Sequence, residues 1–256
     1  YILCMSFMRR ADTWGVEASF TLESYQKLLD PNYLSVFGRS LWLAVLTTLL
    51  TLLIGYPFAY FTAGLPAKKR SLALMLVIVP FWTNSLVRIY GWMILLRGQG
   101  VVNSLLAALG LIDAPLKLLY NFGAVLVGMV YALIPFMILS VYNAVAKLDP
   151  ALIEAARDLG AGRWRAFWTI TVPMTRAGIM AGCVLVFIPS IGLFFISDLL
   201  GGSKTMLLGN LIRDELLTAR NWPLGAALSV VMMAATLLVI GGYRRLSGEK
   251  SLEGIV

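Results

Sequence analysis

Residues 147–173 read KLDPALIEAARDLGAGRWRAFWTITVP, a polar and basic segment between two long apolar stretches. Asp149 is a good N-cap, and Pro150 suits the first position of a helix. Strong helix formers follow, and Gly160 is placed to end the helix in a left-handed turn. The pattern therefore predicts a short helix that begins after Asp149 and ends at Gly160.

The second half of this segment predicts another short helix, which begins near Gly162 and stops before Pro173 because proline cannot continue a helix. The segment as a whole then connects two apolar stretches as a helical hairpin. On its own, such a segment also fits a plain connector on a membrane surface, rich in alanine because alanine suits helices.

The apolar stretches on both sides of the segment are long enough to cross a membrane, which takes about 20 residues. Three further stretches in the chain have the same character, and an apolar fragment at the start is interpreted as the end of a truncated first span. The predicted spans are 1–8 (partial), 40–63, 71–96, 123–145, 175–197 and 223–243. Continuous apolar runs without period-two alternation favour helices over a barrel. The fold class is therefore an all-α transmembrane domain of six helices covering residues 1–256.

Composition supports a membrane protein. The chain is 59% hydrophobic and only 13% charged, with a mean hydropathy of +0.83, whereas a soluble domain carries about 25% charged residues. The net charge is +8, but the basic residues fall in short runs between apolar stretches, as membrane topology places them. Nucleic-acid binding is therefore disfavoured.

The distribution of charge predicts the orientation. The segments that would share one side with residues 147–173 carry a net charge of +6, and those on the other side carry +2. The positive-inside rule then places both termini and residues 147–173 in the cytoplasm. Gly178 and Gly182, four residues apart in the fifth predicted span, fit close packing between helices.

The equipment of an intramembrane enzyme is missing from the sequence. The chain has no histidine and only two cysteines, so no metal site or activated nucleophile is indicated. It also has no glycine-rich phosphate loop, because Gly248-Glu-Lys-Ser251 lacks the glycine spacing. We expect no cofactor on this chain, and any ATP hydrolysis would come from a partner.

Residues 147–173 resemble the EAA loop of type I ABC importer permeases, although Val172 stands where the family usually has leucine. The matching positions are Glu154, Ala155, Ala156, Gly160, Ile170, Val172 and Pro173. The resemblance implies a MetI-like permease fold in which this loop docks in a groove on an ATPase subunit. The residues that it implies for ATPase coupling are Glu154, Ala155, Ala156, Asp158 and Gly160.

Three more segments resemble the permeases of polyamine (spermidine/putrescine) ABC importers: PFWTNSLVRIYG at 80–91, FFISDLLGG at 194–202 and RNWPLG at 220–225. The resemblance implies transport of polyamines across a bacterial inner membrane. It also implies a PotC-like second permease, two PotA-like ATPases that use ATP and Mg, and a PotD-like periplasmic polyamine-binding protein.

An extended polycation is expected to pass carboxylates and aromatic faces, since a cation over an aromatic ring gains roughly 0.5–2 kcal/mol. Ionisable groups at membrane depth are costly and therefore candidates for function. Asp198 is the leading candidate, because it ends the fifth span on a helix predicted to break near Pro189-Ser190. Trp82 is another candidate, because it lies about 18 Å into the bilayer beside two polar neighbours. The predicted substrate-path residues are Asp198, Trp82, Asn84, Thr83, Tyr90 and Glu215.

Ordinary interpretations of these residues remain open. Asp198 also fits a helix-end carboxylate in contact with water, and Trp82 fits packing between helices. Tyr90 fits an anchor at the membrane interface. At the level of function, the alternatives are a type I ABC permease for another small solute, and a secondary transporter driven by an ion gradient.

Overall fold

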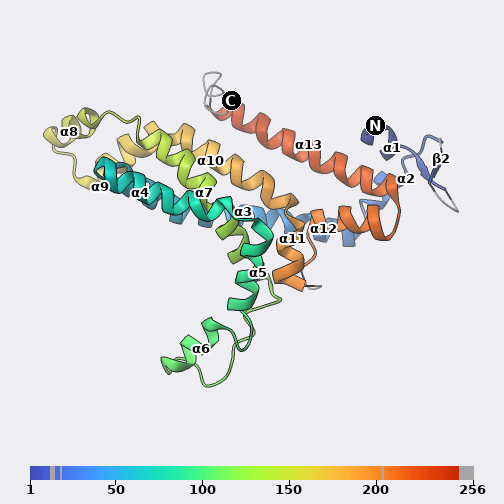
Figure 1. Cartoon of the computed structure of the whole chain (residues 1–256). Helices are drawn as coiled ribbons and strands as arrows, with labels where there is room; N and C mark the ends of the chain where they lie inside the picture. Colours follow the sequence, from blue (N-terminus) through green and yellow to red (C-terminus); the bar gives the residue numbers. More distant parts are fainter. Residues whose placement is uncertain (12–14, 18, 203–204, 248–256) are drawn as a thin grey trace. The chain divides into compact units, whose positions relative to one another are not determined.

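A computed structural model of the chain describes residues 1–11, 15–17, 19–202 and 205–247 (Figure 1). These residues are mostly helical and form two compact units. Unit 1 comprises residues 1–46, 85–129 and 188–239, and unit 2 comprises residues 47–84, 130–187 and the described part of 240–256.

Four helices among the described residues are long and apolar enough to cross a membrane, and a bent pair of helices forms a fifth candidate. The four are α3 (Pro31–Ala63), α7 (Phe122–Val145), the helix from Arg163 to Gly192, and α13 (Trp222–Ser247). The first predicted span contains only the five-residue helix α1 (Ile2–Ser6). Thus the count of six spans stays a prediction.

Helix α3 begins nine residues before the predicted start of its span at residue 40. Pro31 stands at its first position, where a proline has no hydrogen bond to lose. The Asp30 carboxylate accepts a hydrogen bond from the backbone N–H of Asn32 at 2.9 Å. Asp30 and Pro31 therefore allow the helix to begin before the apolar span itself.

The bent pair corrects the prediction of one continuous helix over 71–96. Helix α4 (Ala67–Ile78) and the 3-10 turn η1 (Val79–Trp82) lead to Thr83, and α5 (Ser85–Leu95) then leaves at 96°. Thr83 has an extended backbone with ψ of 154°, and its hydroxyl donates to the Pro80 carbonyl at 2.7 Å. Pro80 has no N–H to donate, which weakens the helix at this point.

The predicted fifth span, 175–197, is also interrupted. Helix α10 (Val172–Gly192) contains Pro189 in its interior and ends at Gly192, and the next residue, Leu193, has ψ of 68°. The break therefore lies at Leu193 rather than near Pro189-Ser190. The short helix α11 (Phe194–Ile196) and the π-helical turn η3 (Ser197–Gly201) follow.

Close packing explains the position of this break within unit 1. Helix α12 (Leu208–Arg213) approaches so closely that a Cβ at Gly209 would lie 2.8 Å from the Gly192 carbonyl oxygen. Gly128 of α7 likewise has no room for a Cβ, because Leu200 and Ile196 lie against it. Glycines thus let the broken segment pack against its neighbours.

The remaining elements of unit 1 are short. They are β1 (Arg9–Arg10), which pairs antiparallel with β2 (Val16–Glu17), and the helices α2 (Glu23–Lys27) and α6 (Val101–Ala108). Asn103 of α6 is 3% exposed. It exchanges two hydrogen bonds with the backbone of Leu116, at 2.9 and 3.0 Å, which close the loop after α6.

In unit 2, α7 and α10 pack closely through the predicted pair of glycines. A Cβ at Gly178 would lie 2.8 Å from the Ser140 carbonyl oxygen, and one at Gly182 would lie 2.6 Å from the sulfur of Met137. Because neither position has room for a side chain, the prediction of close helix packing at these glycines is confirmed.

Candidate functional site

The segment 147–173 folds locally as its sequence predicts in its first half. Helix α8 (Pro150–Asp158) begins with Asp149 as N-cap, whose carboxylate accepts from the Ala151 N–H at 3.0 Å. Gly160 has φ of +84°. Its N–H donates to the Arg157 carbonyl at 2.9 Å, and the Ala161 N–H donates to the Ala156 carbonyl at 2.9 Å. These two bonds form a Schellman motif, so the predicted left-handed stop at Gly160 is confirmed.

The predicted coupling residues lie on the surface of this helix. Ala156 is half-buried, and the other four, Glu154, Ala155, Asp158 and Gly160, are exposed. Leu159 is 89% exposed and Trp164 is 78% exposed. Figure 1 shows α8 and α9 in the connection between α7 and α10.

The second half of the segment differs from the prediction, because the helix does not stop before Pro173. Helix α9 (Arg163–Ala166) continues through the π-helical turn η2 (Phe167–Thr171) into α10, as one helix from Arg163 to Gly192. A proline lacks an N–H and crowds the carbonyl four residues before it. A π turn just ahead of the proline widens the backbone ring, which allows the helix to continue.

Phe167 anchors this continuous helix inside unit 2. Its ring makes edge-to-face contacts with Tyr56 and Tyr60 of α3, with centroid distances of 5.7 and 5.6 Å. The Tyr56 hydroxyl also lies 3.1 Å from the hydroxyl of Thr175. The sequence analysis did not single out Phe167. Its signal is the spacing of Trp164, Phe167 and Trp168, which places three aromatic rings on adjacent positions of one helix.

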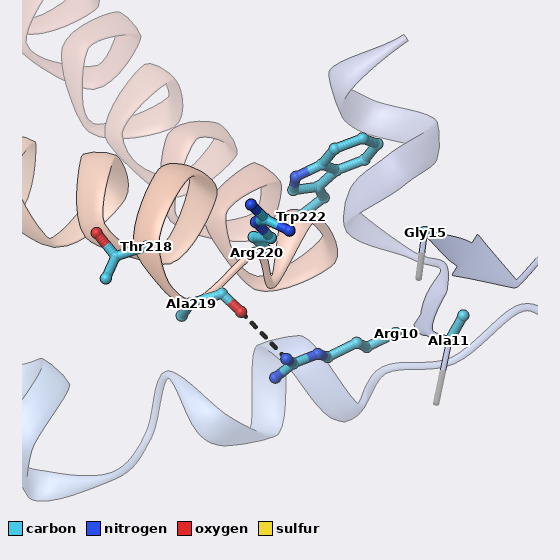
Figure 2. A pocket seen from close by; sticks show the side chains of 7 residues that line it. All are labelled: Arg10, Ala11, Gly15, Thr218, Ala219, Arg220 and Trp222. Carbon is cyan, nitrogen blue, oxygen red and sulfur yellow. Dashed lines mark hydrogen bonds between the residues drawn. The ribbon is translucent and has the colours of Figure 1, made fainter. Parts of the chain in front are cut away.

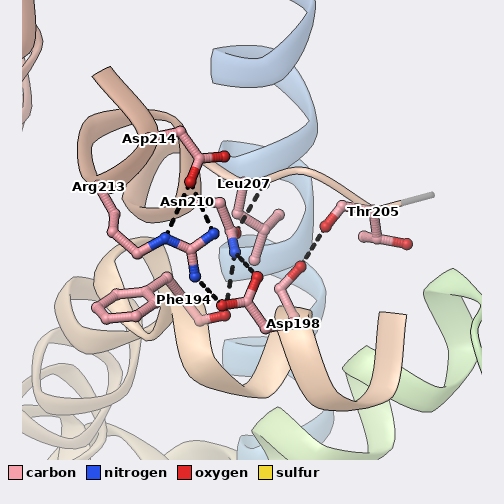
Figure 3. Close-up of polar contacts among 8 residues, drawn as sticks. Phe194, Asp198, Thr205, Leu207, Asn210, Arg213 and Asp214 are labelled. Atoms are coloured by element: carbon pink, nitrogen blue, oxygen red, sulfur yellow. Dashed lines mark hydrogen bonds and ion pairs between the residues drawn. The ribbon is translucent and has the colours of Figure 1, made fainter. Parts of the chain in front are cut away.

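The second candidate site surrounds Asp198 in unit 1 (Figure 3). Asp198 lies in η3, and its carboxylate accepts a hydrogen bond from the Asn210 side chain at 2.6 Å. The other carboxylate oxygen forms an ion pair with Arg213. Arg213 also donates from Nε and Nη2 to Asp214, at 3.0 and 2.8 Å. Its guanidinium carbon lies 5.3 Å from the centre of the Phe194 ring.

Asn210 holds this arrangement in place. It is 3% exposed, and its side-chain oxygen accepts from the Leu207 N–H at 3.1 Å. Its side-chain nitrogen also donates to the Phe194 carbonyl at 3.2 Å. The Asp198 and Arg213 side chains are 35% and 31% exposed. The hydrogen bond to Asp214 and the pairing with Asp198 raise the pKa of Arg213 above its ordinary value. The guanidinium therefore stays charged.

The other predicted substrate-path residues are distributed between the units. Tyr90 and Glu215 belong to unit 1 with Asp198. Tyr90 is 47% exposed on α5, which packs against η3. Glu215 lies in the π-helical turn η5 (Asp214–Thr218) and accepts from the Tyr33 hydroxyl at 3.1 Å.

Trp82, Thr83 and Asn84 belong to unit 2 and lie at the break between α4 and α5. The Trp82 side chain is 83% exposed, and Thr83 and Asn84 are exposed as well. The break thus presents an indole and two polar side chains together. That the six residues in both units line one path stays a prediction.

A pocket in unit 1 has the opposite chemistry (Figure 2). It is lined by Arg10 and Arg220, by Trp222, and by small residues between them. Arg10 donates to the Ala219 carbonyl at 3.1 Å. Two guanidinium groups repel a polycation, so this pocket does not suit a polyamine. Among the described residues, no cluster of acidic and cysteine side chains is suited to a metal ion.

Comparisons with known proteins agree with the fold. Residues 55–248 match the family model of the binding-protein-dependent transport system inner membrane component. The chain is similar to the spermidine/putrescine transport system permease protein PotB of Escherichia coli K12, with 48% identity over 97% of this chain and 92% of that protein. PotB of Haemophilus influenzae is 44% identical over 95% of this chain and 85% of its own length.

Two solved structures share the fold. A bacterial alginate ABC transporter matches with a TM-score of 0.75 and 19% identity, covering 91% of this chain and 84% of the other. The MetNI methionine ABC transporter matches with a TM-score of 0.59 and 16% identity, covering 85% of this chain and 97% of the other. The predicted all-α permease fold is therefore confirmed. Since the family model covers most of its length, the chain belongs to the binding-protein-dependent transport system inner membrane components.

Proposed function

We propose that this chain is a permease subunit that forms half of a path for polyamines, spermidine and putrescine, across the bacterial inner membrane. The observation that carries this proposal is the 48% identity to PotB over 97% of the chain. The aligned region covers nearly the whole chain, spans and loops alike. The substrate assignment therefore comes from a relative that matches this chain almost from end to end.

ATP hydrolysis belongs to partner subunits in this proposal. The complex contains a PotC-like second permease, two PotA-like ATPases that use ATP and Mg, and a PotD-like periplasmic binding protein. The segment 147–173 lies in the cytoplasm, as do both termini, in accordance with the excess of basic residues on that side. Its exposed helix α8 offers Glu154, Ala155, Ala156, Asp158 and Gly160 to an ATPase. Closure of the ATPases then drives the change between inward-open and outward-open states.

The substrate path in this proposal uses Asp198 as its main carboxylate, with Glu215 as a second one. The exposed aromatic faces of Trp82 and Tyr90 support contact with ammonium groups. Thr83 and Asn84 supply polar groups beside Trp82 that replace part of the hydration of the substrate. Separate weak contacts of this kind let an extended polycation move on rather than remain bound.

The deciding experiment is ATPase activity of the assembled complex, reconstituted in lipid with its binding protein. We expect spermidine to stimulate hydrolysis several-fold, and an anion such as sulfate to leave it unchanged. Stimulation by another solute and by no polyamine would contradict the substrate assignment. Spermidine uptake by this chain reconstituted alone, without ATP, would instead support a secondary transporter.

A further inference from the structure

The Arg213 guanidinium forms an ion pair with Asp198, the carboxylate that the proposed path assigns to the substrate. The ion pair with Asp198 comes from two elements that a break at Leu193 brings together, η3 and α12. The guanidinium also lies over the Phe194 ring at 5.3 Å. A carboxylate and an aromatic face are the two groups that bind an alkylammonium ion. Arg213 thus occupies a complete ammonium site (Figure 3).

We propose that Arg213 is a specificity-determining residue, an internal cation that holds Asp198 and Phe194 until an ammonium group of the substrate displaces it. The proposal rests on the proposed function, because it takes a polyamine as the displacing cation. It assigns to Arg213 a role in selecting the substrate, not only in neutralising an acidic residue.

The geometry allows this exchange without leaving a charge unpaired. After displacement, Arg213 keeps its two hydrogen bonds to Asp214, at 3.0 and 2.8 Å. The Asp198 carboxylate keeps the hydrogen bond from Asn210 at 2.6 Å. Asn210 is itself buried and held by backbone groups. An unpaired buried charge is costly, so a second partner for each ion lowers the barrier to exchange.

The exchange also favours polycations over small monovalent ions. A single ammonium or sodium ion has to replace the Nη1 group of an arginine that two hydrogen bonds to Asp214 hold in place beside Asp198. A polyamine displaces the same arginine with one ammonium group while its other charges bind elsewhere on the path. That additional binding is unavailable to a monoamine. Arg213 therefore weakens the binding of every cation at Asp198, and only a polyamine compensates for this loss through its other charges.

The test is the concentration of spermidine that gives half-maximal ATPase stimulation of the assembled complex. Arg213→Gln removes the internal cation, and we expect the half-maximal concentration to fall about 1.5- to 5-fold, the range for a partly exposed ion pair. We also expect that butylamine does not stimulate the wild-type complex but does stimulate the variant. Arg220→Gln removes the same charge from the pocket in Figure 2 and is the matched control, with no expected change.

Two further variants keep the test decisive. In Arg213→Lys the charge remains but the fork of donors is lost, so the half-maximal concentration should lie between those of the wild type and Arg213→Gln. The double variant Asp198→Asn/Arg213→Gln should lose the gain, since the carboxylate is gone.

An unchanged or raised half-maximal concentration in both Arg213 variants would overturn the proposal and leave Arg213 as a structural clamp between η3 and α12. A wild-type complex that does not respond to spermidine contradicts the proposed function instead. The two failures are therefore distinguishable.

Discussion

The segment 147–173 and the Asp198 cluster differ in how far apart in the chain their determinants lie. Helix α8 is fixed at both ends by neighbours within two to five residues, through the Asp149 cap and the turn at Gly160. Asp198 is instead held by Asn210 and Arg213, residues 12 and 15 positions later in the chain. The first site depends on local backbone chemistry and the second on tertiary packing.

This difference has a functional meaning in the proposed transporter. A surface that docks on a separate protein has to be presented in one shape before the partner arrives, and local caps achieve that. A substrate site has to release what it binds. An ion pair with alternative partners on both sides, such as Arg213 with Asp198 and Asp214, suits release because neither ion is committed to one contact.

The largest expected effect concerns α8 and the turn at Gly160, which we propose dock on the ATPase. Gly160→Asp places a side chain at φ of +84°, which glycine tolerates better than any other residue, and Glu154→Lys reverses an exposed charge. We expect both variants to abolish polyamine uptake while the protein still inserts into the membrane. Uptake of labelled spermidine and immunoblots of membrane fractions measure the two properties.

Gly162→Asp is the matched control for Gly160→Asp. Gly162 is the N-cap of α9, with φ of −64°, and a Cβ there meets no atom within 4 Å. Aspartate is favoured at an N-cap, so this variant should retain uptake. Normal uptake in Gly160→Asp and Glu154→Lys would remove the assignment of α8 to ATPase coupling.

An intermediate effect is expected in the Asp198 cluster. Asp198→Asn removes the charge but keeps the shape, so the apparent affinity for spermidine should fall about tenfold, the loss for one charge-assisted hydrogen bond. Assembly of the complex should be nearly unaffected, because Asn210 can still bond to the new amide. Uptake kinetics measure the affinity, and purification of the complex measures assembly. Unchanged kinetics would leave Asp198 as a bystander.

The smallest effect tests how local the first site is. Asp149→Ala removes the cap of α8, whose loss costs about 1 kcal/mol of helix stability. We expect partial loss of ATPase coupling, with more hydrogen exchange in α8. Asp149→Ser keeps a capping oxygen and should restore both. Equal loss in the alanine and serine variants would show that the cap is not the cause.

Sequence alone predicts the features that depend on near neighbours. The caps at Asp149 and Gly160 and the close approach at Gly178 and Gly182 follow from residue type and spacing, and the structure has them. The predicted helix stop before Pro173 is wrong because a π turn lets the helix continue through this proline, and no residue pattern nearby indicates that turn.

The sequence also does not predict the pairing of Asp198 with Arg213. It requires the chain to break at Leu193 and α12 to pack on Gly192, and both depend on contacts between segments distant in the chain. The sequence therefore indicates Asp198 as a candidate but does not indicate Arg213, the cation that pairs with it.

The unbroken helix through Pro173 has a mechanical consequence. Since α9, η2 and α10 form one helix from Arg163 to Gly192, α8 is separated from that helix by only residues 159–162. Phe167 of this helix contacts the rings of Tyr56 and Tyr60. In the proposed transporter, a displacement of α8 by the ATPase is therefore expected to turn the long helix about this aromatic contact.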